Sequence, residues 1–319
     1  MHEIRLTLAH SPDPDDAFMW WPVTGKIEPT GARLEGAAGE PVLPCGGIRF
    51  DALPADIHVL NQRAIRSGDL DVTALSVRAY ADVKSRYQIT RCGASFGDGF
   101  GPKVVVSGAR GTMLTRDDLR RRDVRIAIPG RQTTAFLLLG MVLGESLRLN
   151  AERFIELPFE QIIPAVVRGD VEAGLVIHEG QLTFVDAGLA MILDVGAWWK
   201  ERTGLKTPLG INAVRRDLDA RFGEGTKSKV GDLLFASVKY SVEHREESTR
   251  YTLPFALANT QKSADGGKPT LERVDRYCRM YVNDMTEDMA EEGALAIGRL
   301  LGEGASLGLC PDPGEIDLL

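Results

Sequence analysis

The stretch Ala64-Ile65-Arg66-Ser67-Gly68-Asp69-Leu70-Asp71-Val72 decides the fold, because the chain repeats it 101 residues later as Ala165-Val166-Val167-Arg168-Gly169-Asp170-Val171-Glu172-Ala173. In each copy an amphipathic run ends at a glycine, as a helix often does, and a short apolar strand follows. The repeat therefore predicts two α/β units, each with a helix that leads through glycine into a strand.

A second pair of similar segments precedes the repeat. Residues 6–10 read as a strand that leads through a polar loop into a helix starting near Asp16, and residues 125–128 lead through Pro129-Gly130 into a helix near Thr134. This order predicts two similar α/β lobes with a cleft between them. Because strand ends and helix starts meet at such a cleft, we look for chemistry there.

The 319-residue length suits two lobes with separate cores. We expect lobe 1 to comprise residues 1–107 together with 210–319, and lobe 2 to comprise residues 108–209. Residues 31–54 read as a loop or short hairpin, whereas residues 230–245 and 271–301 read as helices that pack back on lobe 1. The chain would then cross between the lobes twice, as at a hinge that closes around a ligand.

The composition argues against nucleic-acid and membrane partners. The net charge is −7, and no apolar run is long enough to span a bilayer. A local arginine cluster reads as a solvated helix face, because no aromatic residues interleave with it; it consists of Arg116, Arg120, Arg121, Arg122 and Arg125.

The four cysteines are scattered without CxxC pairing, which predicts reduced thiols and no structural metal site. The chain enters a strand within its first residues, and no signal peptide is visible. We therefore expect a cytoplasmic protein without a metal or other cofactor.

The opening loop Ser11-Pro12-Asp13-Pro14-Asp15-Asp16 is unusually acidic. An aspartate suits a helix N-terminus, so capping explains one of these residues. Three carboxylates in four positions exceed what one cap requires. They could also accept hydrogen bonds from substrate hydroxyls or bind a divalent cation.

The segment Gly130-Arg131-Gln132-Thr133-Thr134-Ala135 lies between a strand and an apolar helix. It offers free backbone N–H groups, two hydroxyls and the positive end of a helix dipole, which favour a carboxylate or phosphate. The alternative is an N-capping threonine and nothing more. Neither a Walker A nor a Rossmann glycine pattern is present.

His178 and Glu179 follow the second repeated strand. A histidine at a strand end beside a cleft is suited to act as a general base, although many such histidines are only structural. Among the other histidines, His10 at the end of the first strand is equally well placed. Ser76 and Arg78 occupy the equivalent position in lobe 1, so we expect both segments to meet at the cleft.

The residues quoted above resemble a known family, the MqnA/MqnD group of menaquinone biosynthesis. The resemblance follows these motifs in order along nearly the whole chain: Ser11-Pro12-x-Pro14-x-Asp16-x-Phe18, Gly97-x-Gly99-x-Gly101-Pro102, Pro129-Gly130-x-x-Thr133-Thr134-Ala135, Ala173-Gly174-Leu175-Val176-Ile177-His178-Glu179, Pro208-Leu209-Gly210 and Met280-Tyr281-Val282-Asn283. It is strongest for the MqnD branch. The opening loop of that branch usually reads Ser-Pro-Cys-Pro-Asn-Asp, so Asp13 and Asp15 are departures.

The resemblance implies a fold like that of type II periplasmic binding proteins. It also implies a lyase that converts cyclic dehypoxanthinyl futalosine to 1,4-dihydroxy-6-naphthoate, with His178 as catalytic base. The substrate would be a small anionic molecule. The substrate-binding residues would be Ser11, Asp16, Ser76, Thr133, Thr134 and Glu179.

Two alternatives belong to other classes. The chain could be a non-catalytic solute-binding protein for a small anionic metabolite, or a chorismate dehydratase of the MqnA type. The Ser-Pro-x-Pro and His-Glu motifs favour the MqnD branch over the second alternative. Loss of turnover with retained binding in His178→Ala would separate an enzyme from a binding protein.

Overall fold

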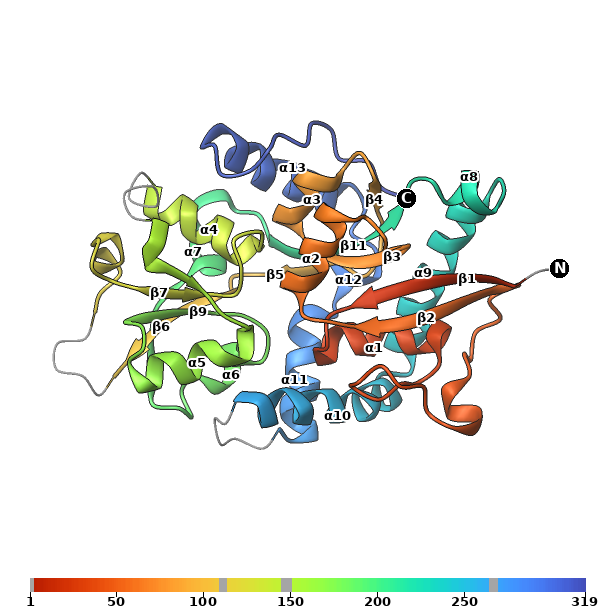
Figure 1. The fold of residues 1–319 in the computed structure, drawn as a ribbon, viewed down its shortest axis with the longest axis horizontal. Helices are drawn as coiled ribbons and strands as arrows, with labels where there is room; N and C mark the ends of the chain where they lie inside the picture. The colour runs from red at the N-terminus through yellow and green to blue at the C-terminus, as the bar shows by residue number, and fades with distance from the viewer. Residues whose placement is uncertain (1–2, 109–113, 145–150, 264–268) are drawn as a thin grey trace.

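Two separate β-sheets, each flanked by helices, lie at opposite ends of an elongated molecule (Figure 1). The computed structural model describes residues 3–108, 114–144, 151–263 and 269–319. The arrangement confirms the two α/β units predicted from the repeat.

The first sheet has the strand order β2-β1-β3-β11-β4, with β5 paired to β11. Strands β1, β2 and β3 are parallel to one another, and β11 is antiparallel to its neighbours. The strands are β1 (Ile4–His10), β2 (Ile48–Pro54), β3 (Val72–Ser76), β4 (Tyr87–Ile89), β5 (Ser95–Gly97) and β11 (Thr207–Arg215).

The second sheet has the order β10-β6-β9-β7-β8, in which β7, β8 and β9 are parallel. Its strands are β6 (Lys103–Ser107), β7 (Ile126–Ile128), β8 (Phe154–Glu156), β9 (Ala173–Val176) and β10 (Leu189–Asp194). The chain crosses between the sheets before β6 and again before β11. Residues 103–107 belong to the predicted lobe 1, whereas in the structure they form β6, which pairs within the second sheet. The lobe boundaries as folding units stay a prediction.

The two repeated segments adopt the same local structure. Helix α2 (Ile57–Arg66) precedes Gly68 and strand β3, and α5 (Phe159–Arg168) precedes Gly169 and strand β9. Both glycines have left-handed backbone, with φ of 59° and 78°. Glycine adopts this conformation without strain, so it can end the helix and redirect the chain into the sheet.

The remaining helices of the two units pack beside the sheets. They are α1 (Pro14–Thr24), α3 (Val77–Val83), α4 (Thr134–Leu143), α6 (Gly180–Thr183) and α7 (Val195–Thr203). The predicted start of a helix near Thr134 is confirmed, because the Thr133 hydroxyl accepts a hydrogen bond from the Phe136 N–H at 3.3 Å and caps α4.

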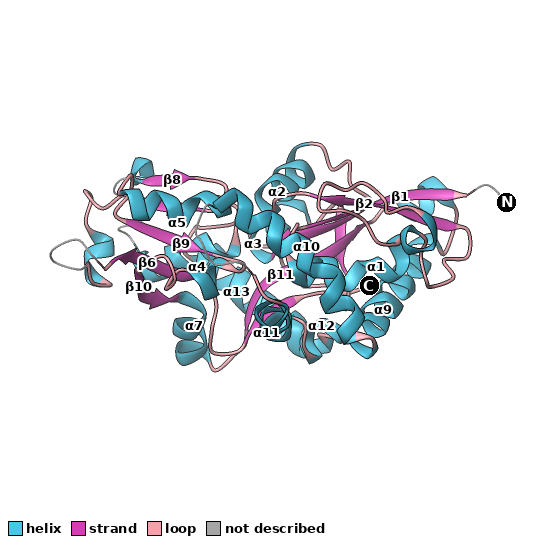
Figure 2. Cartoon of the chain, turned by 90° about the horizontal axis from the view of Figure 1, so that it is seen from below, coloured by secondary structure: helices cyan, strands magenta, loops and turns pink. Residues whose placement is uncertain are grey.

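The C-terminal part is helical and packs on the first sheet, as predicted. Val230, Leu234 and Val238 share one buried cluster with Leu6 and Leu8. Figure 2 shows that α10 and α11 also extend toward the second unit. The helices are α8 (Leu218–Phe222), α9 (Thr226–Glu243), α10 (Arg245–Ser263), α11 (Leu271–Tyr281), α12 (Asp284–Glu287) and α13 (Ala290–Ser306).

The predicted helix over residues 271–301 is broken. Asn283 caps α12 by accepting a hydrogen bond from the Met285 N–H at 3.0 Å, while the Thr286 hydroxyl accepts one from the Asn283 N–H at 3.1 Å. This reciprocal capping box starts a new helix, because it satisfies backbone donors that a continuous helix would bond internally.

The prediction of a loop or hairpin over residues 31–54 is wrong for its last part. Ile48–Pro54 is strand β2, paired in parallel with β1 over its whole length. Its apolar residues alternate with Arg49 and Asp51, and it forms one edge of the sheet. A charged edge strand that ends in proline gives only a weak strand signal in the sequence.

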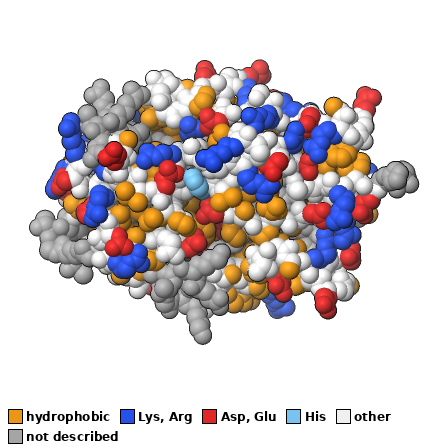
Figure 3. Space-filling view, in the orientation of Figure 1, with side chains coloured by type: hydrophobic (Ala, Val, Ile, Leu, Met, Phe, Trp, Pro, Cys, Tyr) orange, Lys and Arg blue, Asp and Glu red, His pale blue; other side chains and the backbone are white. Residues whose placement is uncertain are grey.

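The surface carries charges of both signs. On the face drawn in Figure 3, lysine and arginine side chains alternate with aspartate and glutamate. In the part of the chain that the structure describes, no helix is long and apolar enough to cross a bilayer.

Close packing at Gly174 gives a testable consequence for stability. A Cβ atom there would lie 2.6 Å from Ile162 Cγ2 and 2.8 Å from Val166 Cγ2, both on the helix that covers β9. We expect Gly174→Val to lower the free energy of unfolding by about 1–3 kcal/mol through overpacking. Denaturant unfolding would measure this. Gly302→Ala is the control, because a Cβ atom there meets nothing within 4 Å and alanine favours a helix. If Gly174→Val were as stable as the parent, the packing argument would be refuted.

Candidate active site

A cavity between the two units contains most of the residues singled out in the sequence. The space in it that is open to the centres of water-sized molecules is about 100 Å³. Parts of the β1–α1 loop, the end of β3, the start of α4, the β9–α6 turn, β11 and α11 line it. The polar lining residues are Ser11, Asp13, Asp15, Asp16, Ser76, Ser95, Thr133, Thr134, His178, Gln181, Asn212, Tyr277 and Tyr281.

His178 lies in the turn directly after β9 and has a left-handed backbone, with φ of 53°. Few residues other than glycine adopt this conformation, and where they do they often mark a functional site. The Phe159 ring packs edge-on against the imidazole, with 4.7 Å between the ring centroids. The turn and this contact hold the ring toward the other unit.

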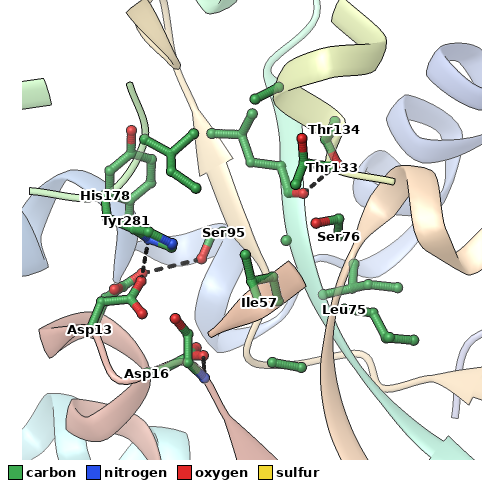
Figure 4. Close-up of a pocket in the computed structure, with 18 of the residues that line it drawn as sticks. Asp13, Asp16, Ile57, Leu75, Ser76, Ser95, Thr133, Thr134, His178 and Tyr281 are labelled. Carbon is green, nitrogen blue, oxygen red and sulfur yellow. Dashed lines mark hydrogen bonds and ion pairs between the residues drawn. The ribbon is translucent and has the colours of Figure 1, made fainter. Parts of the chain in front are cut away.

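The imidazole is paired on one side only. Its Nδ1 atom lies 2.5 Å from Asp13 Oδ2 (Figure 4). Its Nε2 atom is buried and has no hydrogen-bond partner within the described chain. His178 lines the cavity, and Nε2 is the ring nitrogen that is not already bonded within the described residues.

The electrostatic environment of His178 favours its protonated form. Burial lowers the pKa of the imidazole, but the charge and hydrogen bond of Asp13, with smaller contributions from Glu179 and Asp15, outweigh burial and raise the pKa to about 10. A proton accepted by this histidine is therefore held strongly.

The other two aspartates of the opening loop are shifted toward their neutral forms. Burial, together with the nearby charge of Asp13, raises the pKa of Asp15 well above its usual value and that of Asp16 to about 8. Asp16 accepts a hydrogen bond from the Ser11 N–H at 2.6 Å, and Asp15 accepts one from the Ser95 hydroxyl at 3.4 Å. Near neutral pH the loop thus carries less negative charge than its composition suggests, since Asp13 is balanced by His178.

The opposite side of the cavity presents hydroxyl groups (Figure 4). The Thr134 hydroxyl donates to the Leu209 carbonyl at 2.7 Å and accepts from the Arg78 N–H at 3.2 Å. Ser76 is held by Asn61, whose amide donates to the Ser76 hydroxyl and accepts from the Ser76 N–H, both at 3.0 Å. With the N-terminus of α4, these groups make a side suited to an anion.

The structure therefore brings together six of the seven predicted site residues. These are Ser11, Asp16, Ser76, Thr133, Thr134 and His178. Glu179 is turned away: its carboxylate accepts from the Asn259 amide at 2.8 Å, and it lines a smaller neighbouring cavity instead. The predicted roles of all seven stay predictions.

Sequence reasoning missed the contributions of β5, β11 and α11. Asn212 is buried on β11, and its amide donates to the Gly93 carbonyl at 2.8 Å. Tyr281 lies on α11 and donates to Gln181 at 2.9 Å. Asn212 has no local signature, because an apolar strand conceals which side chain reaches the cavity. Tyr281 lies in a quoted motif, but the motif does not say that its side chain reaches the cavity. Asn283 belongs to the same quoted motif as Tyr281, but its side chain caps helix α12.

Comparison with known proteins identifies the family. The family model described as menaquinone biosynthesis matches residues 6–306. The chain belongs to the menaquinone-biosynthesis family. It is 37% identical over 312 residues to the 1,4-dihydroxy-6-naphthoate synthase of Thermus thermophilus, covering 97% of each chain. It is 32% identical to the enzyme of that name from Streptomyces coelicolor, covering 97% of this chain and 96% of the relative.

Solved structures agree with the architecture. A protein of Archaeoglobus fulgidus is 34% identical, with a TM-score of 0.73 over 97% of this chain and all of the other. The alkanesulfonate-binding protein SsuA of Xanthomonas axonopodis is 13% identical, with a TM-score of 0.62 over 99% of this chain and 97% of the other. This menaquinone-biosynthesis protein thus has a periplasmic-binding-protein-like fold, and it is an enzyme similar to the 1,4-dihydroxy-6-naphthoate synthases.

Proposed function

We propose that this enzyme is a lyase that converts cyclic dehypoxanthinyl futalosine to 1,4-dihydroxy-6-naphthoate, with His178 as its general base. One observation carries the assignment of the base. One nitrogen of the His178 imidazole is bound to a carboxylate, and the other, Nε2, is buried and unpaired among the described residues. This histidine lines the cavity of a chain that is similar over its full length to synthases of that product.

The residues of the cavity suit this reaction. His178 would take a carbon-bound proton at Nε2, and the resulting imidazolium is stabilised by Asp13. The N-terminus of α4, with Thr133 and Thr134, would hold the substrate carboxylate. The neutral forms of Asp15 and Asp16 could bond the substrate hydroxyls without repelling an anion. Loss of the sugar-derived fragment is driven forward because it leaves an aromatic ring.

A binding protein for a small anionic metabolite is the second candidate, since the alkanesulfonate-binding protein has the same fold. The strained turn at His178 and its pairing with Asp13 favour the enzyme, because binding an anion requires neither. The enzyme would take a small anionic substrate. A cytoplasmic location is part of the proposal, and the free state of all four cysteines agrees with it.

The first test is to incubate the purified protein with cyclic dehypoxanthinyl futalosine. We expect mass spectrometry to detect 1,4-dihydroxy-6-naphthoate, formed in proportion to enzyme and time. Heat-inactivated protein is the control for spontaneous breakdown. If the compound raises the melting temperature but no product forms, the lyase proposal fails and a binding role replaces it.

A further inference from the structure

The contact between His178 and Asp13 joins the two units of the molecule. Asp13 precedes α1, beside the first sheet, whereas His178 follows β9 of the second sheet. Asn259 of α10 makes a second contact near it, donating to the Pro12 carbonyl at 3.1 Å and to Glu179 at 2.8 Å. The opening loop and the histidine turn are thus held together by their side chains.

The two nitrogens of the imidazole have different environments. Nδ1 is bound at 2.5 Å to a carboxylate that is itself only 4% exposed, and Nε2 is buried at the cavity without a partner in the described chain. A carboxylate can only accept a hydrogen bond, so in the neutral imidazole the proton is held on Nδ1. The lone pair then belongs to Nε2, the atom that can reach a ligand.

We propose that Asp13 is a positioning residue for the reaction, which holds the proton of neutral His178 on Nδ1 and aims the Nε2 lone pair at the substrate. This inference rests on the proposed function, in which His178 is the base. It adds a residue from the other unit that acts on the reaction through His178. A carboxylate behind a catalytic histidine serves this purpose in other enzymes, by fixing the tautomer and stabilising the imidazolium.

The neighbouring carboxylates do not serve this purpose. Four acidic groups surround the imidazole, from α1 and its preceding loop and from the histidine turn itself: Asp13, Asp15, Asp16 and Glu179. Asp15 is bonded to Ser95, Asp16 to the Ser11 N–H and Glu179 to Asn259. Only the carboxylate of Asp13 lies within bonding distance of the ring among the described residues.

The test compares Asp13→Asn with Asp232→Asn. Both substitutions keep the side-chain size, but Asp232 is exposed on α9 and does not line the cavity. We expect Asp13→Asn to lower kcat at least about tenfold, with KM nearly unchanged, because an amide can also donate to Nδ1 and so select the wrong tautomer. We expect Asp232→Asn to leave kcat unchanged.

A second readout does not depend on turnover. Titration of His178 by ¹⁵N NMR in the ligand-free protein should give a pKa well above 6.5 in the parent, and Asp13→Asn should lower it whereas Asp232→Asn should not. Equal kcat and equal titration in Asp13→Asn and the parent would overturn the inference. So would a parent pKa at or below 6.5, even if Asp13→Asn fails to fold. If the parent forms no product, the proposed function fails instead, and the titration still decides the pairing.

Discussion

His178→Ala should lower kcat by about 10²–10⁴-fold, the usual contribution of a general base, while the substrate still binds. The cavity keeps the α4 N-terminus, the threonines and Ser76, which the proposal assigns to holding the substrate. Steady-state kinetics would give kcat, and the ligand-induced shift in melting temperature would report binding.

The matched control for His178→Ala is His244→Ala. His244 is exposed and stacks on Tyr240, with 3.9 Å between the ring centroids, and it does not line the cavity. We expect its removal to leave kcat unchanged. If His178→Ala kept full activity, the base assignment would fail. If both variants bound ligand and the parent showed no turnover, the molecule would be a binding protein.

The pH dependence of kcat/KM should show a base that is predominantly protonated near neutral pH. A general base acts only when it is deprotonated, and the pKa of His178 is raised from 6.5 to about 10. We therefore expect kcat/KM to rise about tenfold per pH unit from near pH 7 until it levels off in the alkaline range.

Initial rates across pH, with substrate well below KM, would measure this profile. An ascending limb centred near the ordinary histidine value would show that Asp13 does not hold the proton on His178 in the free enzyme. Stability must be followed in parallel by thermal unfolding. The raised pKa of His178 stabilises the fold below about pH 6.5, and this contribution is lost as the pH rises through about 10.

Much of the fold can be predicted from the sequence because its signals are local. The helix, glycine and strand of each repeat are adjacent in the chain, and the left-handed glycines at positions 68 and 169 are a property of single residues. Edge strand β2 has no such signal. Its place beside β1 depends on pairing across about forty intervening residues, which a charged strand ending in Pro54 does not reveal.

The two-unit architecture, the family and the segments that carry the site can be predicted from the sequence alone. In parallel sheets the loops between a strand end and the next helix form the ligand site, so Ser76, Thr133 and His178 can be assigned to the site from their places in the sequence. Which side chains act on one another becomes apparent only in the folded molecule. Folding joins Asp13 to His178 and turns Glu179 toward Asn259. The physical reason is that burial and partner, which set the direction of a side chain and its pKa, arise from contacts between segments far apart in the sequence.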